Sequence, residues 1–143
     1  MKNSAKTKLD EFSTPTNIKL ALLWASLMFL YIYNDYFSMY THGTIDDMAK
    51  GRLGPLGQAT EPVLAGVAVM LAIPALMIFL SATLRPLVSR WLNVALGIAY
   101  TGIEVLTLSG APLFYRIVVV LEIALTVLIV WHALQWPKHA PPE

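Results

Sequence analysis

Four long apolar stretches dominate the pattern of this chain, and each is long enough to cross a membrane as a helix. A spanning helix needs about 20 mostly apolar residues. The segments that meet this requirement cover about residues 18–40, 62–80, 86–108 and 113–136. The pattern therefore predicts an all-α fold, a membrane-embedded four-helix bundle within residues 18–137.

The connections between these segments differ in length. The outer loop, residues 41–61, is long and rich in Gly and Pro, and contains a predicted short helix at residues 45–53. We interpret it as a connector at the headgroup level, with a lid over the bundle as the alternative. The later connections are tight, which predicts that the last three segments are successive antiparallel neighbours. Within the second segment, Pro74 has no N–H and should leave the carbonyl of Met70 free.

Basic residues near the ends of the segments predict the orientation, because cytoplasmic loops are enriched in Lys and Arg. The two termini and the second connection carry seven of them, and the other side carries three. Both termini, residues 1–17 and 138–143, are therefore predicted to be cytoplasmic tails of a multi-pass protein. The seven are Lys2, Lys6, Lys8, Lys19, Arg85, Arg90 and Lys138, and the three are Lys50, Arg52 and Arg116.

Composition agrees with a membrane protein of one domain. Of the 143 residues, 57% are hydrophobic and 13% are charged, whereas globular domains have about 25% charged residues. The lipid bilayer is therefore the expected partner. A net charge of +1 without a basic stripe argues against a nucleic-acid partner. The chain has no Cys, and its three His lack metal-ligand spacing, so neither a metal site nor a cofactor is predicted.

Several polar side chains lie inside the apolar segments, where an ionisable group marks a functional site by default. Helical spacing places them on inward stripes of three segments, so we expect them to meet in one polar intramembrane cluster. The cluster is predicted to contain Tyr31, Asn34, Asp35, Tyr100, Glu104, Arg116 and Glu122.

Counting residues from the segment ends gives the expected depth of each charge. Glu104 and Arg116 come out at similar depth on adjacent helices, with Asp35 near them and Glu122 close to the midplane. The ion pairs could instead be structural, and Asp35 and Arg116 could reach the headgroups. Since three acids face one arginine, Glu122 is expected to lack a full cationic partner and to exchange a proton.

Two strings give the chain a wider resemblance. YIYNDYFSMY at residues 31–40 and AIPALMIFL at residues 72–80 are the most specific parts of a pattern that extends over residues 20–137. The pattern resembles a family of small bacterial four-helix membrane proteins of unknown function. This resemblance implies a four-helix bundle in a bacterial or archaeal inner (plasma) membrane and supplies no activity.

Three functions fit these features. The first is proton-coupled transport of a small solute or ion, with a homo-oligomer expected because four helices enclose little room. The second is a membrane enzyme that binds a lipid or another apolar ligand and uses the acids for proton transfer. The third is an accessory subunit whose charges only fix helix packing. The sequence favours the first narrowly over the third and leaves enzymatic activity open.

Overall fold

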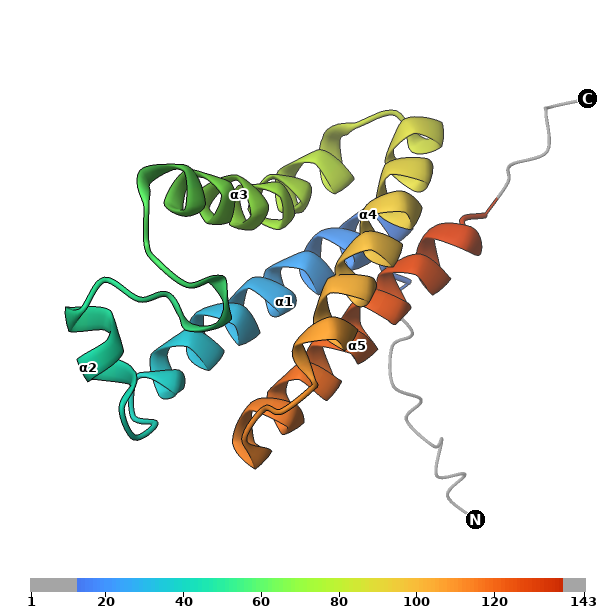
Figure 1. Ribbon diagram of the computed structural model, residues 1–143. Coiled ribbons are helices and arrows are strands. Elements are labelled where there is room, and N and C mark those ends of the chain that lie inside the picture. Colours follow the sequence, from blue (N-terminus) through green and yellow to red (C-terminus); the bar gives the residue numbers. More distant parts are fainter. Residues whose placement is uncertain (1–12, 138–143) are drawn as a thin grey trace, which may run out of the picture.

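Four main helices and two short ones make up the part of the chain that the structure describes (Figure 1). The computed structural model describes residues 13–137. The helices are α1 (Thr16–Ser38), α2 (Thr44–Ala49), the 3-10 helix η1 (Gly54–Leu56), α3 (Glu61–Thr83), α4 (Pro86–Thr107) and α5 (Leu113–Leu134). The predicted all-α class and the four main helices are confirmed. The predicted tail at residues 138–143 and most of that at residues 1–17 lie outside the described residues.

Prolines mark where the main helices begin. Pro62 and Pro86 lie in the first turns of α3 and α4, and Pro15 and Pro112 directly precede α1 and α5. The first N–H groups of a helix have no partner within it, so a proline costs nothing at these positions. Before α2, Gly43 has a φ of 84°, a left-handed conformation that glycine adopts without strain.

In space the helices follow the order α3, α1, α5, α4, with extensive contacts between successive members (Figure 1). The expected pairing of α4 with α5 is present, but α3 packs mainly on α1 and only lightly on α4. The long outer loop allows this, because it lets α3 return along α1. The side-chain amide of Asn17 donates to the carbonyl of Ala82, so the start of α1 meets the end of α3 and these helices are antiparallel.

The hydrophobic core lies toward the end of the molecule where the connection between α3 and α4 is found. Residues from all four main helices contribute to it. They are Leu20, Trp24 and Leu27 of α1, Met77 of α3, Val94 and Tyr100 of α4, and Ile129 and Ala133 of α5. The first half of α3 has no buried residue and takes no part in this core.

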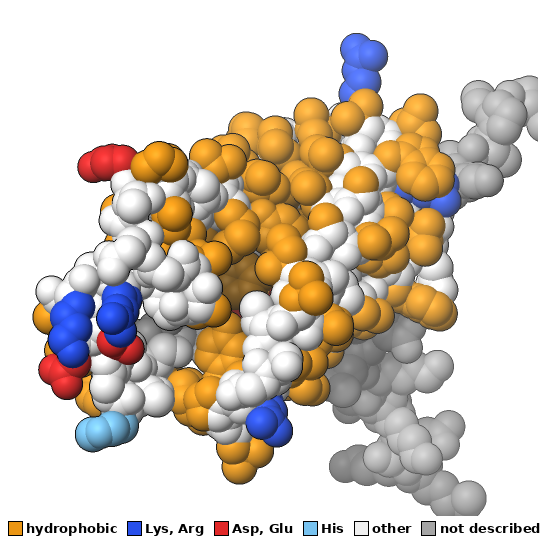
Figure 2. Space-filling view, in the orientation of Figure 1, with side chains coloured by type: hydrophobic (Ala, Val, Ile, Leu, Met, Phe, Trp, Pro, Cys, Tyr) orange, Lys and Arg blue, Asp and Glu red, His pale blue; other side chains and the backbone are white. Residues whose placement is uncertain are grey.

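Three of the main helices are long and apolar enough to cross a membrane, namely α1, α3 and α5. Figure 2 shows one face on which hydrophobic side chains cover the middle and most charged side chains lie toward the ends. The chain is therefore a multi-pass membrane protein in contact with the lipid bilayer. Helix α4 is about as long but is not apolar enough to be counted with them, and its polar side chains at Ser89, Asn93 and Glu104 are buried.

Candidate functional site

Glu104 is a buried carboxylate at the centre of the polar interior. Its side chain is only 3% exposed. The hydroxyl of Tyr31 donates to its Oε1 atom at 2.7 Å, and the hydroxyl of Thr126 lies 2.9 Å from its Oε2 atom. Each carboxylate oxygen therefore has a hydroxyl donor, one from α1 and one from α5. Two such donors stabilise a carboxylate in its charged form.

Glu122 is the second buried carboxylate, also 3% exposed. It accepts one long hydrogen bond, 3.4 Å from the side-chain nitrogen of Asn34 to Oε1. Asn34 is itself buried, and its side-chain oxygen has no hydrogen-bond partner within residues 13–137. We call the group formed by Tyr31, Asn34, Glu104, Glu122 and Thr126 the acid site.

Helix periodicity explains why these five residues meet. Tyr31 and Asn34 are three positions apart in α1, and Glu122 and Thr126 are four apart in α5, so each pair shares one face. Thr126 is also 2.8 Å from the hydroxyl of Thr101, which belongs to α4. The acid site therefore joins three helices through side chains alone.

Two of the residues that the sequence assigned to the cluster lie elsewhere. Arg116 is exposed, and its Nε atom donates to the carbonyl of Ala111 in the turn before α5. Asp35 is also exposed. It follows Asn34 directly, which rotates it about 100° away around the helix. Within residues 13–137 the one ion pair joins Arg52 to Asp47 in the outer loop, so the acids are not paired with a cation there.

Tyr100 is buried beside the acid site but does not bond either glutamate. Its hydroxyl donates to the carbonyl of Met70, the group that Pro74 was predicted to leave free. Its ring meets the Trp24 ring edge-on, with centroids 5.9 Å apart. These two aromatic rings separate the acid site from the other end of the interior.

A second polar group at that other end was missed from the sequence. Asn93 accepts hydrogen bonds from Trp24 (2.7 Å) and Ser81 (3.1 Å), and donates to the Ser89 carbonyl (2.8 Å). All four side chains are buried. Ser89 and Asn93 precede Gly97 at four-residue intervals, so extending the predicted stripe of α4 toward its start would have found them. Because its hydrogen bonds are satisfied, this group is a structural link between α1, α3 and α4.

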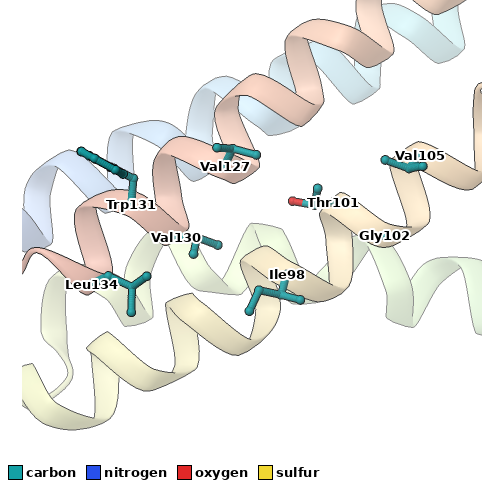
Figure 3. Close-up of a pocket in the computed structure, with 8 residues that line it drawn as sticks. All are labelled: Ile98, Thr101, Gly102, Val105, Val127, Val130, Trp131 and Leu134. Atoms are coloured by element: carbon teal, nitrogen blue, oxygen red, sulfur yellow. The ribbon is translucent and has the colours of Figure 1, made fainter.

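A surface groove lies along α4 and α5, and neither glutamate is among its lining residues. It has a volume of about 500 Å³ and an almost wholly apolar lining (Figure 3). Thr101 is its polar lining residue, and the hydroxyl of Thr101 reaches Thr126 of the acid site. The lining consists of Ile98, Thr101, Gly102, Val105, Val127, Val130, Trp131 and Leu134.

The chemistry available to the acid site is that of oxygen atoms. Among the described residues, no group of three or more His, Cys, Asp and Glu is arranged to hold a metal ion. The site has two carboxyls, a phenol, a threonine hydroxyl and an amide, which can bind and pass protons or contact a small cation. It has no activated nucleophile.

Comparison with known proteins places the chain in a family. The model of a family described as "Family of unknown function (DUF6326)" matches residues 7–141. No curated protein and no solved structure matches the chain. The match agrees with the resemblance to a membrane-protein family of unknown function over nearly the whole sequence.

Proposed function

The chain belongs to DUF6326, and from its own geometry we propose that it carries out proton-coupled transport of a small solute or ion across the membrane. The observation that supports this is the acid site, where two carboxyls are buried without a cationic partner among residues 13–137. A permanently charged carboxylate inside a membrane costs several kcal/mol. An exchangeable proton removes that cost, and its binding and release can be coupled to the movement of a solute.

The two glutamates have different parts in this proposal. Glu104 receives two hydroxyl donors and acts as the fixed carboxylate. Glu122 receives one long hydrogen bond from Asn34 and therefore has free oxygen positions for an exchanging proton.

Access to the site is proposed from the hollow between α3 and α4. Figure 2 shows this face of the molecule hollowed between these two helices, with hydrophobic walls. Trp24 and Tyr100 lie between the acid site and the buried polar group around Asn93. A proton or solute that enters from the hollow would therefore reach the acid site and be stopped there by these two rings. A movement of α3 relative to α4 would be needed for it to pass further. Such a movement is favoured by the weak attachment of the first part of α3. Within the described residues, α3 makes no interhelical hydrogen bond before Met70.

The proposal includes α4 as a fourth span, with both termini cytoplasmic in the inner membrane of a bacterium. Trp24 bonds Asn93 and Tyr31 bonds Glu104, so α4 runs in the same direction as α1. Because the chain has no Cys, single-Cys variants can test this topology. His42→Cys and Leu84→Cys should react with an impermeant maleimide from opposite sides of the membrane. Labelling of both from one side would refute the topology.

Proton flux in liposomes tests the function. The purified protein is reconstituted with an internal pH-sensitive dye, and an inward proton gradient is imposed. Wild type should acidify the lumen faster than protein-free liposomes, and Glu122→Gln should abolish the difference. Glu61→Gln is the matched control, because Glu61 is an exposed acid at the start of α3. Infrared spectroscopy of the carboxyl groups during pH steps reports proton exchange independently of transport.

Two results would refute the proposal. One is wild-type flux equal to that of protein-free liposomes over the accessible range of gradients, including assays with the protein cross-linked as a homo-oligomer. The other is flux that persists unchanged in Glu122→Gln. If Glu122→Gln also unfolds the protein, the carboxyls are structural and the accessory-subunit hypothesis takes its place.

A further inference from the structure

We propose that the groove between α4 and α5 binds an anionic phospholipid, with one acyl chain in the groove and the phosphate on the guanidinium of Arg90. Such a lipid site does not depend on proton transport, because neither glutamate of the acid site lines the groove. The groove accounts for the chain, and the charge at one end of it accounts for the headgroup.

The groove suits a single hydrocarbon chain. Its volume of about 500 Å³ is that of a small-ligand site, and its walls are formed almost wholly by apolar side chains (Figure 3). Leu134, the last residue of α5, lines one end of the groove, and Val127 lies seven residues earlier in the same helix. The groove therefore extends about 10 Å along α5 from the end of that helix. A lipid anchored at this end would place its chain in the groove.

Arg90 places a positive charge at the end of the groove where Leu134 lies. Its Nη2 atom donates to the carbonyl of Leu134 at 3.1 Å. The guanidinium also lies over the ring of Trp91, with its central carbon 5.4 Å from the ring centroid. Trp91 precedes Ile98 by seven residues, or two turns, so it shares the face of α4 that lines the groove. Both contacts therefore hold the guanidinium at this end of the groove.

The guanidinium has donors left for an anion. An arginine carries five N–H groups, and within residues 13–137 only the Leu134 carbonyl accepts a hydrogen bond from Arg90. The one ion pair in this part of the chain joins Arg52 to Asp47, so no carboxylate there neutralises Arg90. Guanidinium groups bind phosphate with two parallel hydrogen bonds. The positive charge therefore favours an anionic headgroup over one whose own cation cancels the phosphate.

A membrane lipid supplies both parts of this ligand. Trp91 and Trp131 are exposed near this end of the groove, and tryptophan side chains favour the level of the lipid headgroups. Arg90 is then at the depth of the phosphates, and the groove leads from it toward the acyl chains. In the topology proposed above this is the cytoplasmic leaflet, which contains anionic lipids.

Quenching of tryptophan fluorescence by brominated lipids tests the headgroup contact. The purified full-length protein in detergent is titrated with phosphatidylglycerol that carries bromine on its acyl chains. Trp131 lines the groove, so a bound chain should lower its emission. Wild type should bind phosphatidylglycerol about fivefold more tightly than phosphatidylcholine with the same chains, the effect of one arginine near an anionic lipid. Arg90→Gln should remove this preference. Arg85→Gln is the matched control, because Arg85 is exposed directly before α4 and does not line the groove.

Filling the groove tests the chain contact separately. Gly102 lines the groove and has nothing within 4 Å of an added Cβ atom, so Gly102→Leu can occupy the groove. It should weaken the binding of phosphatidylglycerol by about fivefold or more, because the chain loses its apolar contacts. Ala99→Leu is the control, since Ala99 is an exposed residue of α4 outside the groove lining.

Several results would refute the lipid site. They are equal affinities of wild type for the two lipids, equal losses in Arg85→Gln and Arg90→Gln, and displacement of the brominated lipid by inorganic phosphate at equal concentration. A homodimer that Gly102→Leu separates, without lipid binding, would assign the groove to a second copy and also refute it. If Arg90→Gln does not fold, the preference of wild type for phosphatidylglycerol and its loss in Gly102→Leu decide. Failure of the proton-flux assay leaves the lipid site intact.

Discussion

The hydroxyl of Tyr100 donates a hydrogen bond to the carbonyl of Met70, which joins the middle of α4 to α3. Four residues after Met70, Pro74 lies inside α3 without an N–H to offer that carbonyl. An unpaired backbone carbonyl is costly where no water is present. Tyr100 therefore repairs a defect that the proline creates, and it does so near the point where α3 diverges from α4.

Removing the Tyr100 hydroxyl should destabilise the protein. Tyr100→Phe keeps the ring against Trp24 but leaves the Met70 carbonyl without its donor. The expected loss is about 1 kcal/mol of unfolding free energy, the typical size for an interhelical hydrogen bond in a membrane. Unfolding of the purified protein by added SDS in mixed micelles measures it.

A double-mutant cycle with Pro74→Ala is the control for this interpretation. Alanine restores an N–H that can bond the Met70 carbonyl within α3, so the hydroxyl of Tyr100 becomes redundant. In that background Tyr100→Phe should cost less, with a coupling of about 0.5 kcal/mol or more. Equal costs in both backgrounds would show that the hydroxyl acts through another group.

The sequence indicated both halves of this contact but not the contact itself. Proline chemistry identified Met70, and the polar stripe of α4 identified Tyr100. Their meeting depends on how two helices rotate and cross, which periodicity within each helix does not determine. The same limit explains why Asn93 was missed as the partner of Trp24, although its four-residue spacing from Ser89 and Gly97 was visible.

Depth counting failed for a related reason. It placed Glu104 opposite Arg116, on the assumption that α4 and α5 extend equally far from their short connection. The structure places Glu104 against Thr126 instead. Thr126 is ten residues beyond Arg116, or about 15 Å along the helix. The tilt and displacement of the two helices account for the difference, and neither can be read from residue numbers.

Substitution of Arg116 can distinguish the predicted position of Glu104, opposite Arg116, from its position in the structure, against Thr126. If it neutralised a buried acid, its loss would leave that acid unpaired and cost about 3–5 kcal/mol. Because it is exposed and, among residues 13–137, its side chain bonds only the Ala111 carbonyl, we expect Arg116→Gln to change the unfolding free energy by no more than about 0.5 kcal/mol. The same SDS titration provides the measurement. A loss of several kcal/mol of unfolding free energy would instead show that Arg116 pairs with a buried acid.

Asn93 should be far more sensitive. Its side chain is fully buried and bonds Trp24, Ser81 and Ser89. Asn93→Leu leaves the Trp24 N–H and the Ser81 hydroxyl without their acceptor, at an expected cost of about 2–4 kcal/mol. Thr83→Ala is the control, because that exposed hydroxyl bonds the Phe79 carbonyl within its own helix, α3. Equal stabilities of the two variants would contradict the structural role of this group.

Gly97 sets how closely α4 approaches α5. A Cβ atom added there would lie 2.7 Å from a methyl carbon of Val130, which is closer than such atoms come in proteins. Valine is branched at Cβ and has few alternative rotamers in a helix. Gly97→Ala should therefore force the helices apart and lower the unfolding free energy by about 1–3 kcal/mol.

A matched glycine and a second substitution test that explanation. Gly102 lies in the same helix with nothing within 4 Å of an added Cβ, so Gly102→Ala should be neutral or stabilising by up to about 1 kcal/mol, since alanine favours the helix. Val130→Ala should recover part of the loss in Gly97→Ala by removing the clashing methyl. Thermal unfolding in detergent can compare all four variants. If Gly97→Ala were as stable as Gly102→Ala, the close approach of α4 to α5 would be incorrect, and with it the contact of Glu104 with Thr126.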